Sequence, residues 1–201
     1  MIAGRVLDPH QLGVYTTGLF LAQLLAAKFV PPINEVAYAA YSRQQGEGQS
    51  DWGSSALLAT IRLVMMVGLP AYAGIAVVAP VLVPVLLGEK WIQIAPLLPI
   101  LAAAMAMLTL QILFSPATNA RGFPGIALKV TMLGAVVMPG AFLIGSQWGV
   151  TGFAWGWVGG MAVLTGATIL LSRPVLGFSY AGLASAIAPP AAAALVMAAG
   201  V

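Results

Sequence analysis

Two charged side chains attract attention because they interrupt an otherwise uncharged, mostly apolar stretch. Lys28 follows the uncharged run from Gln11 to Ala27, and Glu35 comes seven residues after it. Seven residues are about two turns of an α-helix, so both side chains would lie on one face. Pro31 and Pro32 lie between them, and prolines inside a helix remove hydrogen bonds and free backbone carbonyls that can line a cavity. This pattern makes Lys28 and Glu35 candidates for the polar lining of a site that binds an anion.

Signatures of enzyme chemistry are missing from the sequence. His10 is the only histidine and there is no cysteine, so neither a His/Cys metal site nor a Ser-His-Asp triad can be assembled. The nucleotide-binding pattern GxxxxGK[ST] is missing as well. We therefore expect no catalytic residue, no bound metal and no cofactor, and we do not expect an enzyme.

The composition indicates the class of protein. The chain has 201 residues, of which 61% are hydrophobic and only 6% are charged, whereas soluble proteins are about 25% charged. Eight basic and five acidic residues cannot cover the surface of a soluble protein of this size. The net charge of +3 does not require a nucleic-acid partner, because basic loops orient membrane proteins. The composition therefore predicts a polytopic membrane protein that does not bind nucleic acid.

The elements that must position the polar residues are membrane-spanning helices, each needing about 20 apolar residues. Charges and turn residues divide the chain into suitable lengths, and the cluster from Gly145 to Gly149 splits the longest uncharged run in two. The fold class is thus all-α: one transmembrane lobe over residues 1–201 with about six membrane-spanning helices. The expected helices are 12–41, 55–80, 93–115, 126–145, 150–171 and 180–200.

Each candidate binding residue has a second interpretation. Lys28 lies about 25 Å along its helix, where a charge either faces a cavity or extends to the headgroups. Glu35 either shares that cavity or lies in the membrane interface. Arg62 either reaches a lipid phosphate or faces the cavity, and Gln111 either joins two helices by a hydrogen bond or contacts a ligand. We retain Lys28, Glu35, Arg62 and Gln111 as candidate substrate-binding residues.

The distribution of basic residues predicts the orientation of the chain. The loops 42–54, 116–125 and 172–179 lie on one side, and five basic residues are at or near them, against two on the other side. Because cytoplasmic loops are enriched in Lys and Arg, this side is predicted to be cytoplasmic and the chain to start outside. No secretory signal opens the sequence, and Val201 stops where a span would leave the membrane. We therefore expect that both ends are cut from a longer chain.

Several short motifs resemble those of a known family. They are Leu12-Gly13-Val14-Tyr15, the segment from Val36 to Arg43, Gly88-Glu89-Lys90-Trp91, and Asn119-Ala120-Arg121-Gly122. Their order and spacing resemble the second half of the Wzx-type polysaccharide flippases, in the multidrug/oligosaccharidyl-lipid/polysaccharide exporter superfamily. Ala39 stands where that family usually has a proline, so this end of the first helix is expected to be straighter.

The resemblance implies a transporter lobe in the bacterial inner membrane. Its partners would be a polyprenyl-pyrophosphate-linked oligosaccharide, membrane lipids and a missing N-terminal lobe, and its product would serve surface polysaccharide or lipopolysaccharide synthesis. Two alternatives remain open. A drug exporter of the same superfamily would need intramembrane carboxylates, of which only Glu35 is available. A polytopic membrane transferase would need a catalytic His or Asp, and the chain offers only His10 and Asp8.

The predicted orientation can be tested by cysteine labelling, since the natural chain has no cysteine. Cysteines placed at Gln49 and Gly122 should be shielded from a membrane-impermeant thiol reagent in intact cells, because both positions lie on the side rich in basic residues. A cysteine at Gln147 should be labelled. The opposite labelling pattern would contradict the orientation.

Overall fold

The computed structural model describes residues 4, 8–46 and 52–200, and this part of the chain is helical with no strand. The 3-10 helices are η1 (Glu89–Ile94) and η2 (Ser146–Trp148). The α-helices are α2 (Pro9–Gly46), α3 (Trp52–Leu87), α4 (Leu98–Ile112), α5 (Phe114–Ala120), α6 (Gly125–Gly145), α7 (Gly149–Leu176) and α8 (Tyr180–Ala199). The all-α fold class is thereby confirmed.

The predicted starts of the last three helices agree closely with the structure, but α2 extends beyond the predicted 12–41 at both ends and α7 continues five residues past the predicted end at 171. Helices α6, α7 and α8 start within one residue of the predicted positions. Helix α3 continues seven residues past the predicted end, through Pro80 and Pro84. The predicted helix 93–115 was wrong as a single element, because it comprises the end of η1, all of α4 and the start of α5. Pro116 lies one turn after Ile112, the last residue of α4, and a proline cannot donate a hydrogen bond to that carbonyl.

The number of membrane spans also differs from the prediction. In the described part of the chain, four stretches are long and apolar enough to cross a membrane: Ser54–Leu87, Leu98–Ala120, Gly125–Leu176 and Tyr180–Ala199. The count is therefore about four rather than six. The third stretch contains both α6 and α7, because η2 joins them without a strongly polar break. Helix α2, which carries Lys28, Glu35 and Arg43, is not among the four. The chain is a multi-pass membrane protein.

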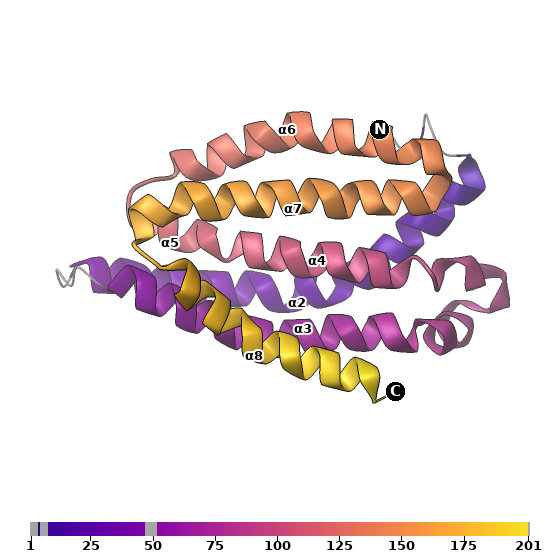
Figure 1. Ribbon diagram of the computed structural model, residues 1–201, viewed down its shortest axis with the longest axis horizontal. Helices are drawn as coiled ribbons and strands as arrows, with labels where there is room; N and C mark the ends of the chain where they lie inside the picture. Colours follow the sequence, from indigo (N-terminus) through magenta and orange to yellow (C-terminus); the bar gives the residue numbers. More distant parts are fainter. Residues whose placement is uncertain (1–3, 5–7, 47–51, 201) are drawn as a thin grey trace.

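The helices lie alongside one another in a bundle (Figure 1). Helix α6 packs on α7, α7 packs on α4, α4 packs on α3, and α3 packs on α8. Helix α2 crosses this row and contacts α3, α4 and α5. The long helices therefore form one lobe, in which α6 and α8 lie at opposite edges (Figure 1).

Two apolar clusters hold the lobe together. In the first, Phe153 of α7 contacts Tyr15 of α2 edge to face, with ring centroids 4.9 Å apart, and stacks on Phe142 of α6 at 4.4 Å. In the second, Phe114 of α5 contacts Phe178 of the α7–α8 turn, with ring centroids 5.7 Å apart. The first cluster ties α2 to the α6–α7 hairpin, and the second ties the short helix α5 to the turn before α8.

The α6–α7 hairpin depends on glycines at its contact surface. A Cβ atom added to Gly152 would overlap the carbonyl oxygen of Gly145, and one added to Gly156 would overlap that of Ala141. Gly152, Gly156 and Gly160 follow one another at four-residue spacing, the pattern that lets helices approach closely in membranes. The backbones of α6 and α7 can touch here only because these side chains are missing.

Gly156→Ala should destabilise the lobe by about 1–3 kcal/mol, because the added methyl group would collide with backbone rather than with a movable side chain. Gly159→Ala is the matched control, since a Cβ atom at Gly159 meets nothing within 4 Å. The free energy of unfolding, measured by SDS titration in mixed micelles, should fall for the first variant and stay unchanged or rise slightly for the second. Equal values for both variants would contradict the close backbone contact.

Candidate functional site

The four candidate binding residues do not gather in one place. Lys28, Glu35 and Arg62 are exposed on the outside of the bundle, whereas Gln111 is half-buried and lines a pocket. Among the described residues, no hydrogen bond or ion pair joins any two of these four side chains. The lobe therefore presents two separate polar features, a charged stripe on α2 and an uncharged pocket around Gln111.

The charged stripe follows one face of α2. Lys28 and Glu35 share this exposed face with Leu24 and Pro31, at helical spacings of three and four residues. The opposite face is buried against the bundle, through Val14, Leu21, Val30, Ala37 and Tyr41. Both charges thus point away from the core of the lobe, and this lobe alone does not enclose them.

The helix continues through both prolines, which lie inside α2. Pro31 and Pro32 cannot donate the hydrogen bonds that the carbonyls of Ala27 and Lys28 would receive in a regular helix. Asn34, which the sequence analysis missed, has its side-chain oxygen buried without a hydrogen-bond partner. This segment of α2 therefore combines an ammonium group, a carboxylate, an unsatisfied amide oxygen and two carbonyls that lack their regular helical donor.

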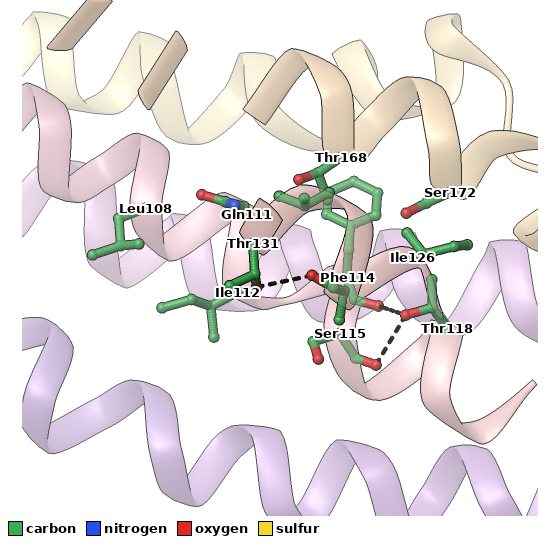
Figure 2. A pocket seen from close by; sticks show the side chains of 12 residues that line it. Leu108, Gln111, Ile112, Phe114, Ser115, Thr118, Ile126, Thr131, Thr168 and Ser172 are labelled. Carbon is green, nitrogen blue, oxygen red and sulfur yellow. Dashed lines mark hydrogen bonds between the residues drawn. The ribbon is translucent and has the colours of Figure 1, made fainter. Parts of the chain in front are cut away.

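The pocket lies between α4, α5, α6 and α7 and has a volume of about 280 Å³ (Figure 2). Its apolar walls include Leu108, Ile112 and Phe114. Its polar lining consists only of uncharged groups: Gln111, Ser115, Thr118, Thr131, Thr168 and Ser172. The end of α4 at Ile112 and the restart of the helix at Phe114 open this space beside α7.

Three of the pocket hydroxyls are already engaged within their own helices. Thr118 donates to the carbonyl oxygens of Phe114 and Ser115, both at 3.1 Å, as Figure 2 shows. Thr168 donates to Leu164 at 2.8 Å and Thr131 donates to Ala127 at 2.9 Å. Their protons are therefore occupied, and their oxygens can only accept further hydrogen bonds.

Ser172, Gln111 and Ser115, whose hydroxyl only accepts a hydrogen bond from Asn119 at 3.4 Å, are the groups of this lining that could still donate. The Ser172 hydroxyl is fully buried and has no hydrogen-bond partner, and in the described part of the chain the Gln111 amide forms no hydrogen bond. Buried polar groups are nearly always satisfied, so an unsatisfied one calls for a partner from outside the protein. The pocket suits a small neutral group that both donates and accepts hydrogen bonds.

Sequence reasoning identified Gln111 but missed the hydroxyls around it. Thr168 and Ser172 are four residues apart on α7 and share one face. Serine and threonine in apolar helices usually bond back to their own backbone, so their presence alone does not indicate a pocket. Ser172 can be told apart from serines and threonines that bond to their own backbone only once the packing of α7 against α4 and α5 is known.

Ser172→Ala should leave the free energy of unfolding unchanged or raise it, because the lost hydroxyl forms no hydrogen bond in the lobe. Thr109→Val is the contrasting variant: the Thr109 hydroxyl is bonded to the Tyr72 hydroxyl at 2.8 Å, and both residues are buried. Leaving Tyr72 without that partner should cost about 1–3 kcal/mol. A comparable loss for Ser172→Ala, measured in the same SDS titration, would show that its hydroxyl has a structural partner.

Comparisons with known proteins relate this chain to polysaccharide biosynthesis. A family described as polysaccharide biosynthesis protein matches residues 1–96. The lipopolysaccharide biosynthesis protein WzxC of Escherichia coli (strain K12) is 25% identical over 182 residues, which cover 90% of this chain and 37% of that protein. The chain thus spans little more than a third of the length of this curated relative. No solved structure matches. Together, the two sequence matches show that this multi-pass membrane protein is similar to proteins of polysaccharide biosynthesis, in agreement with the predicted Wzx-type resemblance.

Proposed function

We propose that this chain forms the C-terminal lobe of a flippase in the bacterial inner membrane. Its substrate would be a polyprenyl-pyrophosphate-linked oligosaccharide, moved from the inner to the outer leaflet for the synthesis of surface polysaccharide such as lipopolysaccharide. The similarity to WzxC and to the polysaccharide biosynthesis family supports this class of activity. The proposal assigns the protein no catalytic step, because a flippase relocates its substrate without changing it.

The observation that carries the proposal is the outward-facing charged stripe on α2. Lys28 and Glu35 lie within a long helix of a membrane protein, yet they face away from the core of their own lobe. Helix α2 packs alongside α3 and α4, which belong to stretches apolar enough to cross a membrane, and charged residues at membrane depth usually face a cavity or a partner rather than lipid. A second lobe opposite α2 would convert this face into one wall of a polar cavity.

In such a cavity the roles of the side chains follow from their chemistry. The Lys28 ammonium would meet the negative charge of the pyrophosphate or of an acidic sugar as a point charge. Glu35 and the carbonyls freed by Pro31 and Pro32 would accept hydrogen bonds from sugar hydroxyls. The lipid tail would stay in the bilayer, and rocking of one lobe against the other would alternate access between the two sides.

The other two candidate residues take subordinate places in this proposal. Arg62 is exposed on α3, where its long side chain can reach a lipid phosphate or the edge of the cavity. Gln111 belongs to the uncharged pocket within the lobe and is separate from the stripe on α2. We therefore place the primary anion contact at Lys28.

Lys28→Gln should reduce polysaccharide export in the host strain by roughly tenfold or more, because a hydrogen bond to a charged group contributes about 1.5–3 kcal/mol. Lys28→Arg should restore part of the export, since the positive charge remains. Export of the surface polysaccharide and abundance of the protein in the membrane are measured side by side.

Lys90→Gln is the control for this experiment, because Lys90 is an exposed lysine of η1 whose ammonium lies 5.9 Å from the ring centroid of Trp91. Its replacement should leave export unchanged. Near-normal export by Lys28→Gln at normal abundance would contradict the cavity role and would indicate a lysine that only extends to the headgroups.

A further inference from the structure

The turn between α7 and α8 is held in a defined conformation. Gly177 adopts a positive φ of 70°, and its N–H donates to the carbonyl oxygen of Arg173 at 2.9 Å. Phe178 is buried against Phe114, and the Ser179 hydroxyl accepts a hydrogen bond from the N–H of Gly182 at 2.9 Å. The turn is thus fixed to the core on one side and to the first turn of α8 on the other.

This turn presents one oriented cation. The guanidinium carbon of Arg173 lies 4.4 Å from the ring centroid of Tyr180, in a cation–π contact. In the described part of the chain Arg173 forms no side-chain hydrogen bond and no ion pair. Stacking on an aromatic ring holds the plane of a guanidinium but leaves its N–H donors available at the edges. Arg173 therefore has a set orientation and unused hydrogen-bond donors.

A hollow of about 530 Å³ lies beside this cation. Its walls are Leu170, Pro174, Gly177 and Phe178, together with Arg173 and Tyr180 themselves. The structure describes three acidic residues: Asp8 just before α2, Glu35 in α2 and Glu89 in η1. None of them lines the hollow. The negative charge that would balance Arg173 has to come from outside the described chain.

We propose that this hollow binds the phosphate of an anionic phospholipid headgroup. A guanidinium pairs with phosphate through two parallel hydrogen bonds, a geometry suited to one preoriented on a ring. The hollow lies where two apolar helices end, the depth at which lipid phosphates lie in a membrane. Leu170 and Pro174, which are exposed, offer apolar surface to the glycerol and upper acyl carbons, and inorganic phosphate would leave that surface uncovered. This site is independent of the proposed transport activity.

The test counts bound lipids on the purified full chain by native mass spectrometry, with phosphatidylglycerol and phosphatidylcholine as probes. The natural chain should retain one phosphatidylglycerol in preference to phosphatidylcholine. Arg173→Gln should weaken retention of phosphatidylglycerol about fivefold, the effect of one basic residue near an anionic headgroup. Arg173→Lys should be intermediate, because an ammonium keeps the charge but loses the two-point geometry. Tyr180→Leu should also weaken retention, since the guanidinium loses its support.

Lys129→Gln is the matched control. Lys129 is exposed near the start of α6, which lies at the same end of the bundle as the α7–α8 turn (Figure 1). Its replacement removes the same charge and should leave lipid retention unchanged; an equal loss would overturn the proposal in favour of a general charge effect. An excess of inorganic phosphate should not displace phosphatidylglycerol. Displacement would overturn the proposal, because it would show that the hollow binds free phosphate rather than a lipid headgroup. Unchanged phosphatidylglycerol retention by Arg173→Gln would refute the site.

Discussion

Inside a bilayer every backbone N–H and C=O has to find its partner within the protein, and the rest of this structure depends on that constraint. It explains why the described chain is helical almost throughout, and why threonines such as Thr118 and Thr168 return their protons to carbonyls of their own helices. It also gives weight to the exceptions. The buried hydroxyl of Ser172 and the buried amide oxygen of Asn34 have no such partner, and Ser172 lines a pocket in which a group from outside would fit.

The exceptions divide into two chemically different regions. On α2, the charged stripe with Lys28 and Glu35 faces outward and is suited to an anionic group. Between α4 and α7, the polar lining of the pocket consists only of hydroxyl and amide groups, so the pocket is suited to a neutral group. A sugar linked through a pyrophosphate carries both kinds of group, but only the stripe on α2 faces a surface that a second lobe could cover. This difference is why the proposed transport role rests on Lys28 rather than on the pocket, although the pocket is the better enclosed of the two.

The sequence was sufficient to predict the helices but not their contacts. Charges, glycines and prolines mark helix ends in an apolar chain, so α6, α7 and α8 were located within one residue at their starts. The break between α4 and α5 was missed because Pro116 occurs in a run that is apolar on both sides, and prolines elsewhere in this chain, such as Pro80 in α3, do not break their helix.

The contacts between helices were harder to predict. The stripe from Gly152 to Gly160 was visible in the sequence, but that a side chain at Gly145 would collide with α7 depends on which turn of α6 meets α7. The neighbours of Gln111 come from three other helices, which no local pattern relates to one another.

Two arginines that contribute equally to the predicted orientation have different surroundings in the folded lobe. Arg121, after α5, donates from its terminal nitrogen Nη1 to the carbonyl oxygen of Val175 at 3.2 Å. That carbonyl belongs to the last turn of α7, where a helix leaves its final carbonyls without intrahelical donors. Arg121 thus supplies a donor to a backbone carbonyl that would otherwise lack one, and it joins α5 to α7.

Arg173, in that same last turn of α7, lies instead on the ring of Tyr180. Because Arg121 already supplies a donor to the end of α7, Arg173 is not needed there. A basic residue placed at a membrane face for orientation can therefore either stabilise the fold or remain available to lipid, and its partners decide which.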